Sequence, residues 1–190
     1  VFKYGRCRAA AITVDITPVE NMYHRMWGAA LHDQAAGIHQ PLEANLLLLQ
    51  SRSGEPDDSV LVVSLDHCLF WKRDLDPIKA ILVETTGFAD DQIVVFFTHT
   101  HAAGLMDTGR ESLPGGDLIA PYLAEMADRL AAAVNGLQRR LCDVWLTAAT
   151  GTCSLATNRD LWDSERQQFV CGYNPDGNAD PTVMTIRVTN

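Results

Sequence analysis

The apolar residues of this chain follow two kinds of spacing, one typical of strands and one typical of helices. Four short apolar runs have the length of strands. These runs cover residues 9–17, 42–50, 60–66 and 93–98. Between the last two runs, Leu75, Ile78 and Leu82 recur at helical spacing, and Gly87 supplies a left-handed stop. The pattern therefore predicts a helix over residues 74–87, between two strands.

The order of these elements predicts how the strands pair. A turn-rich segment at 51–59 separates two adjacent runs, which favours an antiparallel hairpin. The strand, helix and strand over 60–98 form a βαβ unit, whose strands are parallel and whose crossover is right-handed. A second helix is expected over 119–141, and further strands over 143–151 and 181–190. The predicted fold class is α/β, with a mixed sheet, a βαβ unit and flanking helices.

Residues 1–190 are expected to form the amino-terminal portion of a single, larger catalytic domain. The chain begins at Val1, and its last predicted strand runs to Asn190 with no closing element after it. A strand in that position needs neighbours to cover it. We therefore expect the domain to be incomplete at Asn190.

Composition narrows the classes of function. With 190 residues and 47% hydrophobic content, the chain can bury a sizeable core, and its longest apolar runs fall short of the roughly 20 residues that span a bilayer. The net charge of -9 argues against nucleic acid as a partner, because phosphate binding requires a concentrated basic surface. Five cysteines without a CxxC motif favour free thiols over a structural zinc knot or a disulfide framework. Compartment and oligomeric state stay open.

The candidate functional residues lie where two predicted strands end. His99 and His101 follow the strand at 93–98, and in an extended chain residues two apart project from the same face. Asp66 ends the first strand of the βαβ unit, so it reaches the same carboxyl edge, where α/β proteins bind their ligands. His67 is expected to point the other way. The alternative is that both histidines are held by hydrogen bonds in a loop and that Asp66 only forms a turn.

Five sequence blocks, in this order, carry a resemblance to a known family. They read AAITVDITP, GIHQPLEANLLLL, VLVVSLD, IVVFFTHTH and ATNRD. In this order and spacing the chain resembles the amino-terminal part of the neutral/alkaline, non-lysosomal ceramidases and their bacterial relatives. The family continues the histidine motif as HTHSGP, whereas Ala102 and Ala103 stand here in place of the serine and glycine. This departure leaves a different amide or ester substrate open.

The resemblance implies a zinc enzyme that hydrolyses the N-acyl amide of ceramide to sphingosine and fatty acid. Under it, His99 is a zinc ligand, His101 faces the substrate, and Arg159 of the NR motif serves activity. The family's remaining zinc ligands and its serine nucleophile would lie beyond Asn190. A catalytic zinc ion requires three protein ligands and an open position, so residues 1–190 alone are expected to be inactive.

The chemistry of amide hydrolysis explains these residue types. Zinc polarises the carbonyl oxygen and lowers the pKa of the water that it binds. His99 would bind the ion as a neutral imidazole. Asp66 or a backbone carbonyl would fix the tautomer of His99 as a second-shell partner. His101 would move a proton, and Arg159 would stabilise negative charge on the oxygen. The remaining alternatives are a related metal hydrolase and a non-catalytic binding module that keeps the fold.

Overall fold

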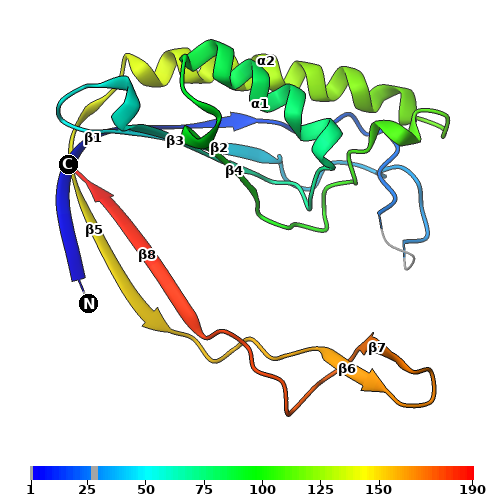
Figure 1. Ribbon diagram of the computed structural model, residues 1–190. Coiled ribbons are helices and arrows are strands. Elements are labelled where there is room, and N and C mark those ends of the chain that lie inside the picture. The colour runs from blue at the N-terminus through cyan, green and yellow to red at the C-terminus, as the bar shows by residue number, and fades with distance from the viewer. Residues whose placement is uncertain (1, 27–29) are drawn as a thin grey trace. The chain divides into compact units, whose positions relative to one another are not determined.

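The computed structural model describes residues 2–26 and 30–190 and is shown in Figure 1. Its strands and helices alternate in the α/β manner that the sequence predicts. In chain order they are β1 (Phe2–Asp15), β2 (Glu43–Gln50), β3 (Ser59–Leu65), α1 (Lys72–Thr86), β4 (Ile93–Phe97), α2 (Ile119–Gln138), β5 (Cys142–Thr152), β6 (Asp160–Asp163), β7 (Gln168–Cys171) and β8 (Thr182–Thr189). Six strands form one mixed sheet in the order β4-β3-β2-β1-β5-β8.

The chain divides into two compact units. We call residues 7–143 the core unit, and residues 1–6 with 144–190 the strand unit. The core unit holds both helices, and the strand unit holds most of β5 together with β6, β7 and β8. Strands β1 and β5 each contribute to both units.

The predicted hairpin and βαβ unit are both confirmed in the core unit. Strands β2 and β3 are antiparallel, with Leu46 opposite Val63. Strands β3 and β4 are parallel, with Val63 opposite Val95, and α1 forms the crossover between them. The crossover helix ends at Gly87, whose φ of 70° is the left-handed conformation that a residue without Cβ adopts at low cost. The carboxyl ends of β3 and β4 therefore meet at one edge.

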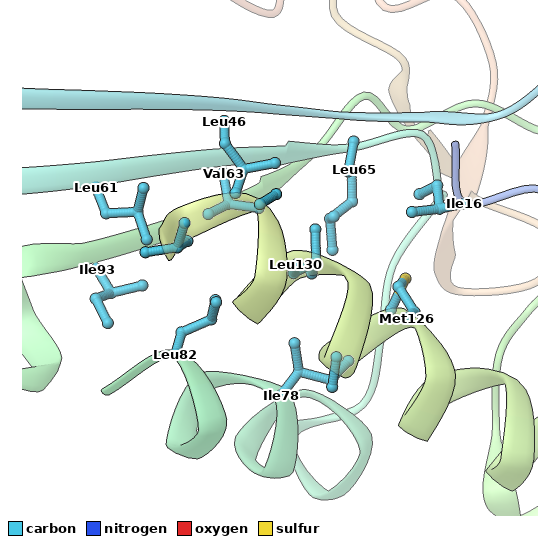
Figure 2. Close-up of a cluster of buried hydrophobic side chains, with 14 of the residues drawn as sticks. Ile16, Leu46, Leu61, Val63, Leu65, Ile78, Leu82, Ile93, Met126 and Leu130 are labelled. Atoms are coloured by element: carbon cyan, nitrogen blue, oxygen red, sulfur yellow. The ribbon is translucent and has the colours of Figure 1, made fainter. Parts of the chain in front are cut away.

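The core lies between the sheet and the two helices, which cover the same face of β2, β3 and β4 (Figure 1). Alternate residues of each strand point into it, as the period of two requires. Figure 2 shows Leu46, Val63 and Leu65 of the sheet facing Leu82 of α1 and Leu130 of α2. All five side chains are at most 1% exposed. This packing holds the edge that carries the candidate residues.

Two elements differ from the sequence-based expectation. β1 begins at Phe2 rather than at residue 9. The polar segment at 157–167 contains β6, which pairs with β7 in an antiparallel hairpin. The rings of Trp162 and Phe169 face one another across that hairpin at 5.1 Å, and this cross-strand aromatic pair stabilises a hairpin with little apolar periodicity. None of the helices in the described parts of the chain is long and apolar enough to cross a membrane.

Candidate metal centre

The loops after β3 and β4 are joined by backbone hydrogen bonds beyond the strands themselves. The Thr98 amide donates to the Leu65 carbonyl at 3.0 Å, and the His99 amide donates to the His67 carbonyl at 3.1 Å. The parallel pairing thus continues for about two residues past the end of β4. As a result, the segment that follows Asp66 and the segment that contains His99 lie side by side.

His99 adopts a conformation that few side-chain-bearing residues adopt. Its φ is 60°, in the left-handed region, where histidine is found more often than most residues other than glycine. The conformation costs about 1–2 kcal/mol for an L-residue. It turns the chain out of the strand at His99, so the two-residue alternation of an extended strand does not apply there. The rings of His99 and His101 nevertheless lie close, with their centroids 5.3 Å apart.

A backbone carbonyl orients the His99 imidazole. Nδ1 of His99 lies 3.1 Å from the carbonyl oxygen of Cys68. Since a carbonyl oxygen only accepts, Nδ1 carries the proton, and the lone pair of Nε2 is available. This is the arrangement in which a neutral imidazole binds a metal ion through Nε2.

Three side chains with ligand atoms gather at this edge. One ring nitrogen of His99, one of His101 and the sulfur of Cys68 all lie within 4.8 Å of one another. Both histidines are exposed, whereas Cys68 is buried, and burial raises the pKa of its thiol. Imidazole and thiolate are ligands that zinc prefers, so the donor set fits this ion.

Cys68 was not among the predicted site residues. The sequence did hold a signal for it, because Cys68 lies two residues after Asp66, at the strand end that the βαβ argument had already selected. The tight turn in which the His67 amide donates to the Leu65 carbonyl brings the thiol back toward the edge.

Asp66 also lies at this edge, and its carboxylate is committed to the backbone. Its Oδ2 accepts from the Glu43 amide at 3.0 Å, and its own amide donates to the Glu43 carbonyl. The His99 ring has a backbone carbonyl as partner, which is the other arrangement expected from the sequence. A second-shell role for Asp66 stays a prediction.

His67 points away from this group into the core, as expected. It is fully buried, and its Nε2 lies 2.7 Å from the hydroxyl of Tyr122, which in turn donates to the carbonyl of Ile16 at 2.5 Å. Burial lowers the pKa of His67 to about 4, while the charge of Asp66 and the backbone of Gly104 act in the opposite direction. No described group meets hydrogen-bond geometry at its Nδ1. His67 is therefore a neutral, structural histidine at physiological pH.

A cavity of about 350 Å³ runs along the loop that follows the histidines. Thr100, Ala102, Ala103 and Gly104 form one of its walls, and Asp66 also lines it. The loop is held tightly, since a Cβ built on Gly104 would lie 2.3 Å from the Cβ of His24. The small residues of the HTHAAG stretch thus keep this space open.

Arg159 lies in the strand unit, directly before β6. Its side chain is exposed, and its carbonyl accepts from the Gly172 amide at 2.9 Å, which ties it to the end of the β6-β7 hairpin. In the described parts of the chain, its guanidinium makes no hydrogen bond or ion pair. A role for Arg159 in activity stays a prediction.

Comparison with solved structures identifies the fold. No family model and no curated protein matches the chain in sequence. The chain is similar to the crystal structure of neutral ceramidase from Pseudomonas aeruginosa, with a TM-score of 0.71 over 96% of this chain at 19% identity. It has a ceramidase fold. A structure described as ceramidase complexed with C2 gives a TM-score of 0.70 over 96% of this chain at 18% identity.

The ceramidase fold is thus confirmed, and at this level of identity the similarity concerns the fold alone. The chain covers 29% of the Pseudomonas aeruginosa ceramidase and 28% of the second structure, so it corresponds to less than a third of either. The expected resemblance and the predicted mixed α/β architecture both agree with these structures.

Proposed function

We propose that this chain is the amino-terminal portion of the catalytic domain of a zinc-dependent hydrolase that cleaves an N-acyl amide, with ceramide or a related molecule as substrate. The observation that carries the proposal is the grouping of imidazole and thiol donors within 4.8 Å at the carboxyl edge of β3 and β4, in a chain with a ceramidase fold. Ligands of α/β proteins bind at this edge.

Each proposed residue has a distinct task. His99 binds zinc through Nε2, because its Nδ1 proton is directed at the Cys68 carbonyl. When bound, zinc supplies a Lewis acid for the amide carbonyl and an acidified water. His101 moves a proton toward the nitrogen of the leaving amine, and the planar donors of Arg159 stabilise negative charge on the carbonyl oxygen. Asp66 does not bind the ion itself and supports the edge on which His99 lies.

The cavity beside the HTHAAG loop offers space for part of the substrate. Its volume of about 350 Å³ falls within the range of small-molecule sites. Met22, Ile38 and Leu42 give it apolar lining, which suits an acyl chain. The small side chains of Ala102 and Ala103 leave room where a bulkier group would close the space.

The first experiment removes the proposed zinc ligand. In the full-length protein, His99→Ala should strip zinc or weaken its binding greatly, with hydrolysis of an N-acyl amide lost in parallel. Elemental analysis measures zinc stoichiometry, and circular dichroism checks folding. Unchanged stoichiometry in a folded variant would rule out His99 as a ligand.

The second experiment separates the two histidines. If His101 serves the substrate, His101→Ala should lower kcat while zinc content stays near that of the wild type, because the loss falls on the transition state. Loss of metal together with rate would make His101 a ligand instead.

A panel of substrates tests which bond is cleaved. Ceramide, other N-acyl amides and matched esters should be offered to the full-length protein, since the HTHAAG sequence differs from the HTHSGP of the resemblance. Preference for an ester or a short acyl amide would identify a related hydrolase. Zinc binding without hydrolysis of any member would favour a non-catalytic binding module.

A further inference from the structure

The sulfur of Cys68 approaches the His99 ring closely. Sγ lies 3.5 Å from Nδ1 and 3.7 Å from Nε2, and the residue is 1% exposed. Two of the chain's five cysteines are buried, Cys7 and Cys68. In the described part of the chain, Cys68 is the cysteine that belongs to a group of three donors able to hold a metal ion.

In the metal-free chain, a weak hydrogen bond from the thiol can account for this approach. A thiol would have to donate to a ring nitrogen that bears a lone pair. Nδ1, the nearer nitrogen, already donates its proton to the carbonyl of Cys68 itself at 3.1 Å. The remaining lone pair belongs to Nε2, the atom that the proposed function assigns to zinc.

The separation of sulfur and Nε2 suits a shared ion. With zinc–sulfur and zinc–nitrogen distances of about 2.3 and 2.0–2.1 Å, two ligands at a tetrahedral angle lie about 3.6 Å apart. The observed distance is 3.7 Å. Because the sulfur is almost equally far from both nitrogens, it does not lie on the axis of the Nε2 lone pair. The distance therefore shows that the two side chains are near enough to share an ion, and the exposed His99 ring must turn for Nε2 to face it.

We infer that Cys68 supplies a thiolate ligand to the metal ion bound by His99. The inference rests on the proposed metal site and adds to it a sulfur donor from the β3 end of the same edge. On binding, a sulfur–metal bond forms and the thiol proton is released to solvent. A thiolate favours Zn²⁺, Co²⁺ and Cd²⁺ over Mg²⁺ and Ca²⁺, which prefer oxygen.

X-ray absorption on the zinc-loaded full-length protein tests for sulfur directly. We expect one sulfur scatterer at about 2.3 Å beside the nitrogen and oxygen scatterers. The Co²⁺-substituted protein should show a thiolate-to-metal charge-transfer band in the near ultraviolet. Bound metal with nitrogen and oxygen ligands alone would overturn the inference and leave the proposed function standing, whereas absence of any bound metal would overturn both.

Variants then assign the sulfur to Cys68. Cys68→Ser and Cys68→Ala should lose the sulfur scatterer and the Co²⁺ band and should weaken Zn²⁺ binding roughly 100-fold. Cys7→Ser is the matched control, because Cys7 is also buried but lies in β1, and it should keep both signals. A sulfur signal that persists without Cys68 would overturn the inference.

A complementary variant keeps the test decisive if the Cys68 variants do not fold. In it, serine replaces the four other cysteines, and Cys68 stays as the one thiol of residues 1–190. Retention of the sulfur scatterer supports the inference. Its loss in a folded, metal-binding protein shows that another cysteine was the donor.

Discussion

The buried histidine beside the candidate metal centre, His67, should make the stability of the core unit depend on pH. His67 is fully buried, and its Nε2 is hydrogen-bonded to the Tyr122 hydroxyl. Replacement by glutamine removes the titrating ring but keeps an amide group that can reach the same hydroxyl. His67→Gln therefore isolates the proton that this position binds after unfolding.

The magnitude follows from the difference between the two pKa values. The pKa of His67 falls from 6.5 to about 4 in the folded chain, chiefly because burial disfavours the charged form. Between these values the unfolded chain binds a proton that the folded chain excludes, so stability rises with pH across this window. The contribution is complete above 6.5 and is lost as pH falls toward 4. At about 1.4 kcal/mol for each pH unit, it amounts to about 3 kcal/mol.

Urea unfolding measures this contribution. Wild type and His67→Gln are compared at about pH 7.5 and about pH 4, with a chelator in every sample so that protonation of metal ligands does not contribute. The free energy of unfolding of the wild type should fall by about 3 kcal/mol more than that of the variant. Equal losses in the two proteins would show that His67 titrates normally and would refute the burial argument.

Four further substitutions test packing and the proposed site. Gly104→Ala should lower the free energy of unfolding, measured in urea, by about 1–3 kcal/mol, because the new Cβ would lie 2.6 Å from the Cα of His24 and the backbone must shift. Gly136→Ala in α2 is the control. Its Cβ would meet no atom within 4 Å, so this substitution should raise the free energy of unfolding slightly. Leu130→Ala should cost about 2–5 kcal/mol in the same assay, since the side chain is fully buried between the helices and the sheet, and a smaller loss would mean that the core collapses around the cavity. Arg159→Lys should lower kcat for the N-acyl substrate although the charge is kept, and an unchanged rate would place the residue outside the reaction.

The fold was predictable where apolar spacing is strong and local. The hairpin of β2 and β3, the crossover through α1 and its stop at Gly87 all follow from alternation, helical spacing and turn residues. The hairpin of β6 and β7 did not, because its stability comes from a pairing across the turn that leaves most of its residues exposed. Such a strand has no apolar period to detect.

The candidate site was predictable in place but not in composition. The strand-end rule brought His99 and Asp66 to one edge, and the structure agrees. The expected cause of the His99–His101 proximity was an extended chain, yet β4 ends at Phe97 and His99 turns in the left-handed region. Cys68 was not predicted as a site residue, because the sequence shows neither the burial of its thiol nor the distance of its sulfur from the His99 ring. These are tertiary quantities, fixed by the hydrogen bonds that join the two loops.

The pairing of the two loops also makes the candidate site local to one part of the sequence. Cys68 and His99 are 31 residues apart in sequence, and the chain between them consists of α1, β4 and their connections. Closing a loop of this length has a modest entropic cost, which grows slowly with length and is offset by the helix packing on the sheet. The proximity of these two side chains therefore depends on the unit formed by β3, α1 and β4, and on the hydrogen bonds between its two loops. A metal ion held by both side chains, as inferred above, would link the two ends of one supersecondary unit.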